Sequence, residues 1–520
     1  MSQDKHISQS DSDSDQDQTV TPFTVASKGA IDYDKLTRDF GCDQIDGTRI
    51  ERWEHVTGMR AHPWLRRGIF YAHQDLDKIL DDYENNVPIY LYTGRGPSSE
   101  AMHMGHMVPF LFTKYLQDAL QAVLVIQMSD DEKYSFKGKV DGNSLEYYND
   151  LTYKNAKDII ACGFNPEKTF IFSNLTTCGG ELYANVVKTM GVTGNQVRGI
   201  YGLNLDNSIG QLAWPAFQCA PAVSSSFSDI LHPNGPYSEP KLDGSRTYIG
   251  PHMRCLVPMA LDQSPYFRMA RDHGDKFGKE GVIKPSTILS KFLVGMHGIN
   301  GKMSSTGADV TNTTIYMTDD PKSIAKKVKK HAFSGGGDTL ELHQKFGGNL
   351  DEDVSYQWLT YFLDDDVELA QIAHAYRNGT MLTGQIKTRA AEAVCGMITR
   401  HQEAREKITD DVVRLFFNRR REFDLGRVQR EPLEMLSPET YAGYGSNFDI
   451  NFGTAPYVEP TTEEKEAIMN EANKKTLCDR LEKDLCKKFG EISANNSPAS
   501  DNAATVANVA PVPVEEVASV

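Results

Sequence analysis

Residues 88–175 alternate between the pattern of a buried strand and the pattern of a helix, which restricts the chain to an α/β fold. VPIYLYT, AVLVIQMSD and KTFIFSNL are short apolar runs typical of buried strands. The helix patterns SSEAMHMGHMVPFLFTKYLQDAL and SLEYYNDLTYKNAKDIIACG lie between them, and the second closes at Gly163. Connections of this kind favour right-handed crossovers. We therefore predict a parallel, Rossmann-like sheet that extends to about residue 310.

Beyond residue 320 the strand patterns fade and helical spacing dominates. Apolar residues recur at helical spacing in PKSIAKKVKKHAF, SYQWLTYFL, DVELAQIAHAYRNG, IKTRAAEAVCGMITRHQEAREKI and DDVVRLFFNRRREF. We predict a second, all-helical domain here. Its basic clusters, Lys326–Lys330 and Arg419–Arg421, have two interpretations, a face for RNA or a solvated helix surface.

The two ends of the chain have the composition of disordered tails. Residues 1–18 are rich in Ser, Asp and Gln, and residues 491–520 are rich in Ala, Asn, Ser, Pro and Val. We predict six segments in all: an acidic tail (1–18), a hairpin and helical extension (19–87), the Rossmann-like domain (88–320), the helical domain (321–455), a C-terminal helical extension (456–490) and a second tail (491–520).

The turn after the first strand carries glycines and two histidines, in TGRGPSSEAMHMGH. Backbone N–H groups at the start of the following helix favour an anion, and Gly96 and Gly105 allow a nucleotide to approach the backbone closely. Arg95 is a candidate ligand of an ATP phosphate. His103 and His106, taken alone, are as readily interpreted as surface or core residues. They lack the carboxylate or thiolate partners of a metal site, so we expect no protein ligands to a metal.

A second motif, GKMSST at residues 301–306, lies near the end of the predicted Rossmann-like region. A glycine-flanked mobile loop could bring Lys302 onto phosphates while its hydroxyl groups donate hydrogen bonds. Met303, Ser304 and Ser305 complete the candidate ATP contacts. H-x-G-H after the first strand and K-M-S-S nearly two hundred residues later are, in this order and spacing, the two signatures of class I aminoacyl-tRNA synthetases.

Composition excludes several classes of function. The formal net charge is -16 at pH 7, which argues against binding nucleic acid by bulk attraction, so any RNA contact must be local. No apolar run approaches the roughly 20 residues of a membrane helix, and the N-terminus lacks the features of a signal or transit peptide. We expect a cytoplasmic protein without membrane contact. The eight cysteines include no C-x-x-C pair, which indicates neither a zinc site nor a disulfide framework.

Several segments together resemble one family. TGRGPSSEAMHMGH, VIQMSDDEKY, ALDQSPYFRMARD, KMSS and KHAFSGG are similar to tryptophanyl-tRNA synthetases of the eukaryotic and archaeal cytoplasmic kind, over roughly residues 20–425. The resemblance implies activation of L-tryptophan with ATP and Mg²⁺, transfer to tRNA(Trp), and a homodimer. It also implies that residues 88–320 form the catalytic domain and that residues 321–455 form an all-helical, anticodon-binding domain. KMSST departs from the final Ser that is commoner in this branch, a change that retains the hydroxyl group.

The resemblance also implies roles for individual residues. His103 and His106 would contact ATP and its developing charge, and Lys302 would neutralise the pyrophosphate while Mg²⁺ bridges its oxygens. The tryptophan pocket would consist of Tyr92, Gln127, Ser129, Glu132, Gln218 and Gln263. The roles of Asp130 and Lys133, which lie beside this pocket, stay open.

Three further segments carry expectations. Residues 19–36 resemble a hairpin that folds over the ATP site in this branch, although a packed edge hairpin is an equal alternative. By resemblance Asp338 could contact an anticodon base, but Gly337 departs from the basic residue that relatives can carry. Residues 231–251 have the Pro, Gly and polar content of a surface insertion.

Three rival classes of protein share parts of this pattern. A tyrosyl-tRNA synthetase has the same fold and signatures. A non-catalytic relative that serves signalling or RNA binding would not need intact His103, His106 and Lys302. A simple adenylyltransferase would not need the helical domain or the K-M-S-S motif. The residues favour a tryptophan-specific synthetase over all three.

Overall fold

The computed structural model describes residues 18–20, 25–27, 31–272, 274, 284–303, 310–450, 453, 457–472, 474–476, 480 and 483. The chain divides into two compact units, residues 1–458 and residues 459–520. In the second unit, residues 462–472 are helical. Apart from Gln18, the two predicted tails lie outside the described residues.

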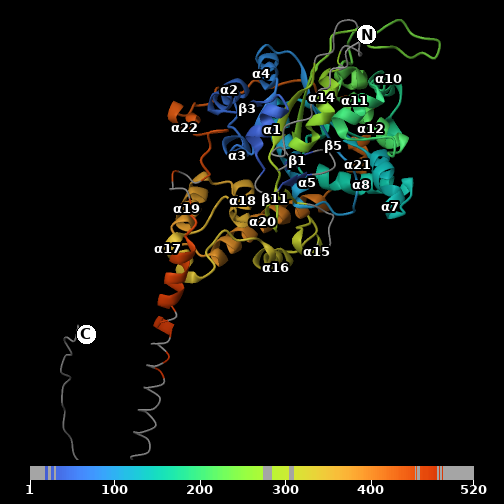
Figure 1. Ribbon diagram of the computed structural model, residues 1–520. Coiled ribbons are helices and arrows are strands. Elements are labelled where there is room, and N and C mark those ends of the chain that lie inside the picture. Colours follow the sequence, from blue (N-terminus) through green and yellow to red (C-terminus); the bar gives the residue numbers. More distant parts are fainter. Residues whose placement is uncertain are drawn as a thin grey trace, which may run out of the picture. The chain divides into compact units, whose positions relative to one another are not determined.

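A seven-stranded mixed sheet forms the centre of the first unit (Figure 1). In sheet order its strands are β3 (Asp43–Gln44), β4 (Phe70–Gln74), β9 (Ser286–Ser290), β8 (Arg254–Ala260), β5 (Ile89–Arg95), β6 (Val123–Met128) and β7 (Thr169–Ser173). The five strands from β9 to β7 run parallel, as predicted. The prediction of a wholly parallel sheet is wrong at one edge, where β3 and β4 run antiparallel. Since β4 pairs with β9, far along the chain, no local pattern indicates this pairing.

The parallel strands bury side chains on both faces, because successive residues point to opposite sides of a sheet. On β6, Leu124 and Ile126 join one apolar cluster, and Val123 and Val125 join another. The first cluster includes residues of α5 (Met104–Leu120) and α8 (Leu145–Ile160). The second includes residues of α10 (Gly180–Thr189), α12 (Ile209–Cys219) and α14 (Ser264–Asp272). The result is the predicted Rossmann-like layering of helices on both faces of a sheet.

The remaining short elements connect these layers. They are α1 (Tyr33–Asp39), α2 (Gly47–Thr57), α3 (Pro63–Arg66), α4 (Leu76–Glu84), α6 (Asp130–Lys133), α7 (Lys139–Asp141), α9 (Asn174–Thr177), α11 (Gly194–Tyr201), α13 (Ser228–Leu231), α15 (Val310–Thr313) and α22 (Pro438–Ala442), with the two-stranded pairs β1 (Gln18–Val20) with β2 (Val25–Ser27) and β10 (Val294–Gly295) with β11 (Gly298–Lys302). The β1–β2 hairpin packs beside β11.

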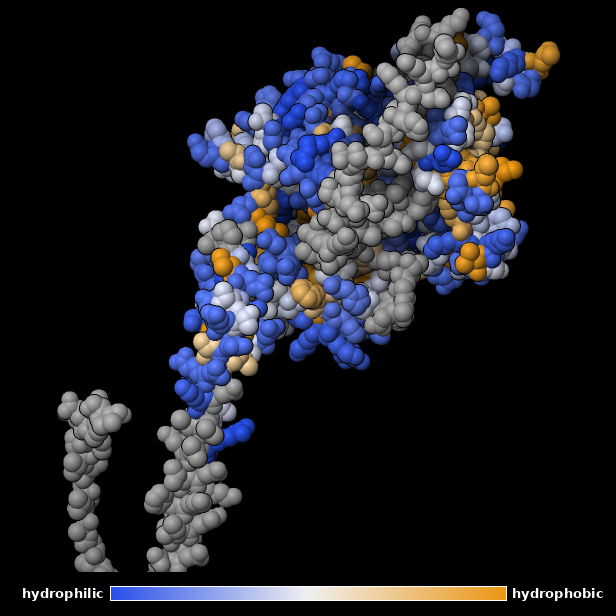
Figure 2. Space-filling view, viewed as in Figure 1, coloured by the Kyte–Doolittle hydropathy of each residue, from blue (hydrophilic) through white to orange (hydrophobic). Residues whose placement is uncertain are grey.

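Apolar side chains also gather on the surface over α10. Tyr183 and Val187 of this helix and Met190, its C-cap residue, are exposed at helical spacing, and we call them the α10 stripe. In Figure 2, hydrophobic residues are concentrated on the side of the molecule where Figure 1 places α10 and α12. Such a stripe is unusual on a monomer, because exposed apolar surface is normally scattered.

Helix α5 begins later than its sequence pattern indicates. We predicted a helix from Ser98, whereas α5 begins at Met104 and His103 is its N-cap residue. The Met104 N–H donates to the carbonyl of Ile315 at 3.0 Å, and His103 forms an isolated β-bridge with Tyr316. This pairing with a segment distant in sequence holds the chain extended up to His103, so the first histidine precedes the helix rather than lying in its first turns.

The second half of the first unit is helical, as predicted. Its helices are α16 (Pro321–His331), α17 (Leu340–Phe346), α18 (Val354–Phe362), α19 (Asp366–Arg377), α20 (Thr383–Glu406) and α21 (Asp410–Phe417). Buried Tyr356, Tyr376 and Ile386 belong to an apolar cluster of this region alone. Helix α20 packs against α16 and α18, and both α20 and α21 reach α8 of the Rossmann-like part.

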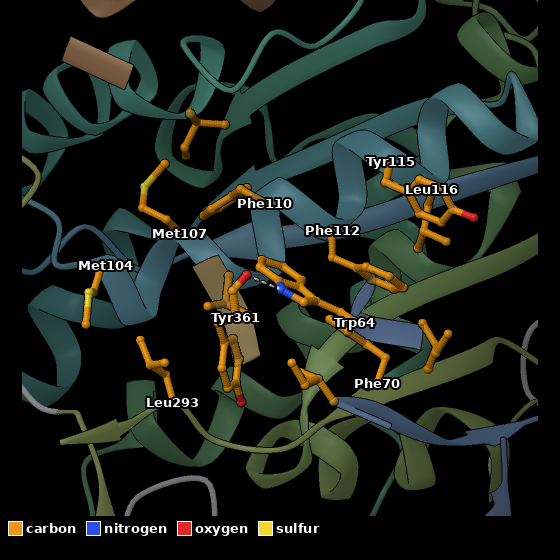
Figure 3. Packing of buried hydrophobic residues seen from close by; sticks show 14 of the residues in the cluster. Trp64, Phe70, Met104, Met107, Phe110, Phe112, Tyr115, Leu116, Leu293 and Tyr361 are labelled. Atoms are coloured by element: carbon orange, nitrogen blue, oxygen red, sulfur yellow. Dashed lines mark hydrogen bonds between the residues drawn. The ribbon is translucent and has the colours of Figure 1, made fainter. Parts of the chain in front are cut away.

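An aromatic cluster joins the N-terminal segment to the helical region (Figure 3). Trp64 of α3 stacks on Phe70 of β4 and on Phe112 of α5, with ring centroids 6.4 and 6.3 Å apart. The Trp64 indole N–H donates to the carbonyl of Tyr361 in α18 at 2.7 Å. A buried N–H is thus satisfied within an apolar core, which fixes the orientation of the ring.

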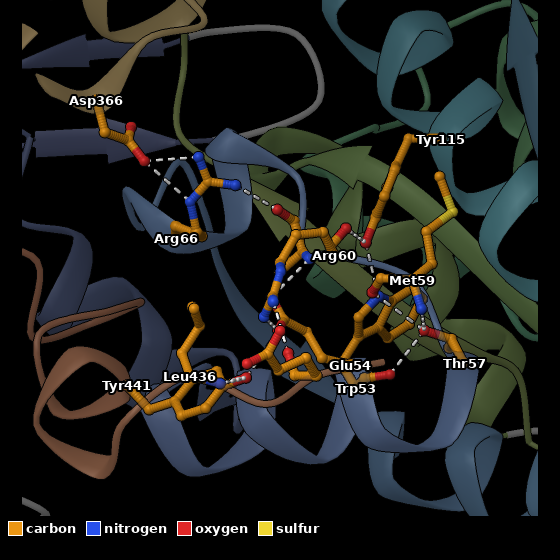
Figure 4. A network of polar contacts seen from close by, with 12 residues as sticks. Trp53, Glu54, Thr57, Met59, Arg60, Arg66, Tyr115, Asp366, Leu436 and Tyr441 are labelled. Atoms are coloured by element: carbon orange, nitrogen blue, oxygen red, sulfur yellow. Dashed lines mark hydrogen bonds and ion pairs between the residues drawn. The ribbon is translucent and has the colours of Figure 1, made fainter. Parts of the chain in front are cut away.

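Residues 418–445 return from the helical region across the Rossmann-like part. Lys168 forms an ion pair with Asp424 at 2.8 Å. The Tyr441 hydroxyl donates to the buried carboxylate of Glu54 at 2.7 Å, within a polar network around α2 (Figure 4). The contacts at α18 and along this returning segment therefore add to those that α20 and α21 make with α8.

The structure changes the interpretation of both basic clusters. Arg419 pairs with Asp229 at 2.6 Å, and the Arg421 guanidinium donates to the carbonyl of Thr169. Lys327 on α16 forms an ion pair at 2.7 Å, with Asp319. These basic groups serve intramolecular packing, so the hypothesis of a free RNA face applies only to their exposed neighbours.

Candidate active site

A cavity of about 550 Å³ opens at the carboxyl ends of the parallel strands β5, β6, β8 and β9. Ligands of open α/β sheets bind at this edge. The predicted site residues that line it are Tyr92, Arg95, Gly96, His103, Gly105, His106, Gln127, Ser129, Glu132, Gln218, Gln263 and Met303. Tertiary folding thus brings together candidates from separate segments of the chain.

Four other predicted residues stand apart from this group. Lys302 is the last residue of β11, and its side chain lies outside the described part of the structure. Ser304 and Ser305 also lie outside the described residues. Asp338 is exposed in the loop before α17 and does not line the cavity. The structure therefore does not bring Asp338 to this site.

The two sequence motifs meet at the start of α5. The rings of His103 and His106 stack with centroids 3.4 Å apart, and the His103 backbone N–H lies 3.5 Å from Nδ1 of His106. A Cβ atom on Gly105 would lie 3.1 Å from the His103 ring and 3.5 Å from Cβ of Met303. The backbone N–H of Met303 donates to the carbonyl of Leu293 at 2.9 Å. The segment that contains Lys302 therefore lies against the first motif, and the absence of a side chain at Gly105 leaves room for the His103 ring.

Arg95 provides positive charge at one end of the cavity. It is the last residue of β5, and its Nε donates to Oδ1 of Asn155 at 3.4 Å. Its buried Nη2 has no hydrogen-bond partner among the described residues. Burial lowers the pKa of Arg95 to about 10, so the guanidinium stays charged at neutral pH. A buried cation with a spare donor, beside the N-terminus of α5, forms a site for an anion.

Gly96 lies under a carboxylate and a lysine. A Cβ atom at this position would lie 2.0 Å from Cε of Lys133 and 2.6 Å from Oε2 of Glu132. Glu132 accepts a hydrogen bond from the Ser129 hydroxyl at 2.6 Å and pairs with Lys133 Nζ at 2.6 Å. A side chain at this position would displace the Lys133 and Glu132 side chains from their present positions. The Glu132 carboxylate thus places an acidic group in the cavity, just after the end of β6.

Tyr92 and Gln127 form the polar part of the cavity wall at the end away from Arg95. The rest of that end is largely apolar. The buried Tyr92 hydroxyl donates to Oε1 of Gln127 at 2.6 Å and lies 3.1 Å from the carbonyl of Gln218. The Gln127 amide donates to Asn174 Oδ1 at 2.9 Å and to the carbonyl of Phe217 at 3.0 Å. All polar atoms of the Gln127 side chain are therefore occupied by protein groups.

Sequence reasoning missed several residues of the cavity wall. Trp214 of α12 and Phe267 of α14 supply flat apolar surface, but their helical spacing does not distinguish them from core residues. Lys291 directly follows β9, and the strand-end rule that singled out Gln127 could have found it. Its Nζ lies 5.7 Å from the ring centroid of Tyr33 and 5.8 Å from that of Tyr71. Burial lowers the pKa of Lys291.

The described residues contain neither a cluster of metal ligands nor a membrane-spanning helix. No group of three or more His, Cys, Asp or Glu side chains within the described ranges is placed to hold a metal ion. Within the same ranges, no helix is both long and apolar enough to cross a membrane.

Comparison with known sequences defines the class of protein. Residues 84–219 and 246–398 match the sequence model of the family described as tRNA synthetases class I (W and Y). The gap in this match, residues 220–245, includes much of the expected surface insertion at 231–251. In the structure, Leu242 is fully exposed and most residues around it are exposed.

Individual relatives narrow the class further. The chain is 47% identical to the cytoplasmic tryptophan–tRNA ligase of Oryctolagus cuniculus over 406 residues, which cover 77% of this chain and 80% of the relative. It is 44% identical to that of Arabidopsis thaliana over 76% of this chain and 93% of the relative. The crystal structure of Plasmodium falciparum tryptophanyl-tRNA synthetase superposes with a TM-score of 0.66 at 42% identity, covering 75% of this chain and 98% of that one. The chain belongs to the tryptophan–tRNA ligase family of class I aminoacyl-tRNA synthetases.

Proposed function

We propose that this chain is a cytoplasmic tryptophan–tRNA ligase. It activates L-tryptophan with ATP to tryptophanyl-adenylate and pyrophosphate, and then transfers tryptophan to the 3′-terminal ribose of tRNA(Trp). The observation that carries the proposal is a single cavity in which an apolar slot with a buried Tyr92 hydroxyl meets an anion site made by Arg95 and the start of α5. Family membership supports the same assignment.

Recognition of tryptophan depends on the indole N–H. The Tyr92 hydroxyl hydrogen is directed to protein acceptors, so its oxygen faces a ligand as an acceptor. An indole N–H supplies the matching donor, whereas a phenylalanine ring would leave the Tyr92 oxygen unpaired. The Glu132 carboxylate, held by Ser129, pairs with the substrate ammonium group. Gln218 and Gln263 complete the polar lining of this pocket.

Activation requires stabilisation of phosphate charge. A carboxylate oxygen of tryptophan attacks the α-phosphorus of ATP, and the bond to pyrophosphate breaks. The negative charge that develops is met by Arg95 and by His103 and His106 at the N-terminus of α5. Lys302 neutralises the departing pyrophosphate. Catalysis consists of positioning and charge stabilisation, and no protein nucleophile takes part.

Mg²⁺ and tRNA complete the reaction. Mg²⁺ enters with ATP as part of the substrate, and phosphate oxygens are its main ligands. The described residues of the cavity supply no cluster of protein ligands for it. After activation, the ribose hydroxyl of the tRNA terminus attacks the carbonyl carbon of the adenylate, and AMP leaves. Asp338, exposed in the helical region, contacts the anticodon.

The active form is a homodimer in this proposal. The α10 stripe supports it, because exposed apolar residues at helical spacing form a surface that a second copy can cover. Leu175 of α9 and Ile209 of α12 are also exposed.

Amino-acid-dependent exchange of labelled pyrophosphate into ATP tests the activity. We expect exchange with tryptophan and none with tyrosine. Lys302→Ala should lower the exchange rate about 100-fold or more, since it removes a charge that is needed only as pyrophosphate leaves. Lys329→Ala, at an exposed position on α16, is the matched control and should leave the rate unchanged. Exchange with tyrosine alone would refute the tryptophan assignment, and an unaffected Lys302→Ala rate would refute the mechanism.

A further inference from the structure

We propose that Asn174 and Asp131 are positioning residues that set the direction of hydrogen bonding in the indole site. Neither side chain lines the cavity, and both lie behind Gln127. This inference rests on the proposed function, because it concerns how the enzyme distinguishes an indole N–H from a group that cannot donate.

Four side chains form a continuous chain of hydrogen bonds behind the pocket. The Tyr92 hydroxyl donates to Gln127 Oε1 at 2.6 Å, and Gln127 Nε2 donates to Asn174 Oδ1 at 2.9 Å. Asn174 Nδ2 then donates to Asp131 Oδ1 at 2.9 Å. The same carboxylate oxygen accepts from the backbone N–H of Glu132 at 2.8 Å. Tyr92, Gln127 and Asn174 are buried, so water does not compete for these bonds.

The end of the chain determines the orientation of every group before it. An amide side chain has one donor end and one acceptor end, and it can turn over to suit its neighbours. Asp131 Oδ1 is an acceptor, so Asn174 must present its NH₂ group there and its oxygen to Gln127. Gln127 must then present its own NH₂ group to Asn174 and its oxygen to Tyr92. Backbone carbonyls at Phe217 and Gln218 reinforce the same direction.

This direction of hydrogen bonding determines how the Tyr92 oxygen can interact with a ligand. With its only hydrogen donated to Gln127 or to the Gln218 carbonyl, this oxygen can only accept a hydrogen bond from a ligand. If the Gln127 amide turned over, its NH₂ group would donate to the Tyr92 oxygen and occupy the lone pair that an indole N–H needs. Asn174 and Asp131 hold the orientation that favours an indole donor.

A comparison of two substrates tests this role. Pyrophosphate exchange is measured with tryptophan and with benzothienylalanine, in which sulfur replaces the indole N–H. We expect Asn174→Ala and Asp131→Ala to reduce the ratio of kcat/KM for tryptophan to that for the analogue about three- to tenfold, the cost of one weakened hydrogen bond. The loss should fall on the KM for tryptophan. Asp131→Asn should keep the ratio within about twofold of the wild type, because its Oδ1 still accepts from both donors.

A matched control separates positioning from simple stability. Asn185 on α10 is also buried and donates to the Ser225 and Ser226 hydroxyls, away from the cavity. Asn185→Ala should affect both substrates equally. An unchanged ratio in both Asn174→Ala and Asp131→Ala would overturn the inference, while absence of tryptophan-dependent exchange in the wild type would refute the proposed function instead.

Discussion

The buried position of Asp131 in the hydrogen-bond chain makes the stability of the protein depend on pH. Burial raises the pKa of this carboxyl to about 7, and the neighbouring Asp130 charge adds to the effect, whereas the hydrogen bond from Asn174 opposes it. The folded protein therefore binds a proton at Asp131 more tightly than the unfolded chain does. Such a group contributes stability at low pH that is lost as the pH rises through its folded pKa.

The stability of Asp131→Asn relative to the wild type should therefore depend on pH. Below about pH 4 both folded and unfolded wild-type chains are protonated at this site, and from there to about pH 7 only the folded chain retains the proton. We expect the wild type to lose on the order of 4 kcal/mol relative to the variant between these limits. Urea unfolding of both proteins at pH 5, 6, 7 and 8 measures the difference. A difference that is constant with pH would contradict the assignment.

Among the secondary-structure elements, the end of α18 depends on an arginine from another part of the chain. The last turn of a helix leaves carbonyl groups without partners. Arg67 is buried and directly follows α3. Its guanidinium donates to the carbonyls of Thr360 and Leu363 at 2.8 and 2.7 Å. It also forms an ion pair with Asp366 at the start of α19. One side chain thus satisfies the end of one helix and the start of the next, and joins the N-terminal segment to the helical region.

Replacement of this arginine should be costly. Arg67→Met removes hydrogen-bond donors from Asp366 and from the carbonyls at the end of α18, in a buried region. We therefore expect the free energy of unfolding to fall by about 3–5 kcal/mol. Arg52→Met removes more exposed ion pairs with Asp77 and Asp81 and should cost about 1 kcal/mol or less. Chemical denaturation compares the two variants. Equal losses of unfolding free energy in the two variants would contradict the role of Arg67 in joining α3 to α18.

At the scale of the whole molecule, the apolar attraction that could join two copies of the chain competes with the repulsion between their negative charges. A net charge of -16 opposes contact between copies, so a dimer requires a local apolar surface. The α10 stripe is such a surface, with three exposed apolar side chains at helical spacing. A stable interface usually buries well over about 1,000 Å² in total, so the proposed dimer interface must extend beyond these three side chains.

Val187→Glu should therefore produce monomers. A charge at the centre of the α10 stripe would be buried without a partner in the proposed dimer. Light scattering or sedimentation at micromolar concentration should give twice the chain mass for the wild type and the chain mass for the variant. Val367→Glu places the same charge at another exposed valine, on α19, and should remain dimeric. A monomeric wild type would refute the dimer itself.

Much of the fold and the cavity could be predicted from local pattern. The strands that became β5, β6 and β7 are runs of apolar residues, and helices such as α8 have apolar residues at helical spacing, because these periods follow from the geometry of each element. Strand ends in a parallel sheet meet at one edge, which explains why Arg95 and Gln127 both line the cavity.

The remaining features depend on contacts between distant segments. The antiparallel pairing of β4 with β9, the late start of α5 and the contact of Gly105 with Met303 join residues that are far apart in the chain. The direction of the hydrogen bonds behind Tyr92 belongs to the same group. The residue types in the sequence were enough to identify the motifs and the buried strands, because local periodicity depends only on neighbouring residues. Only folding decided which polar groups face each other, because satisfaction of buried donors and acceptors depends on which segments meet.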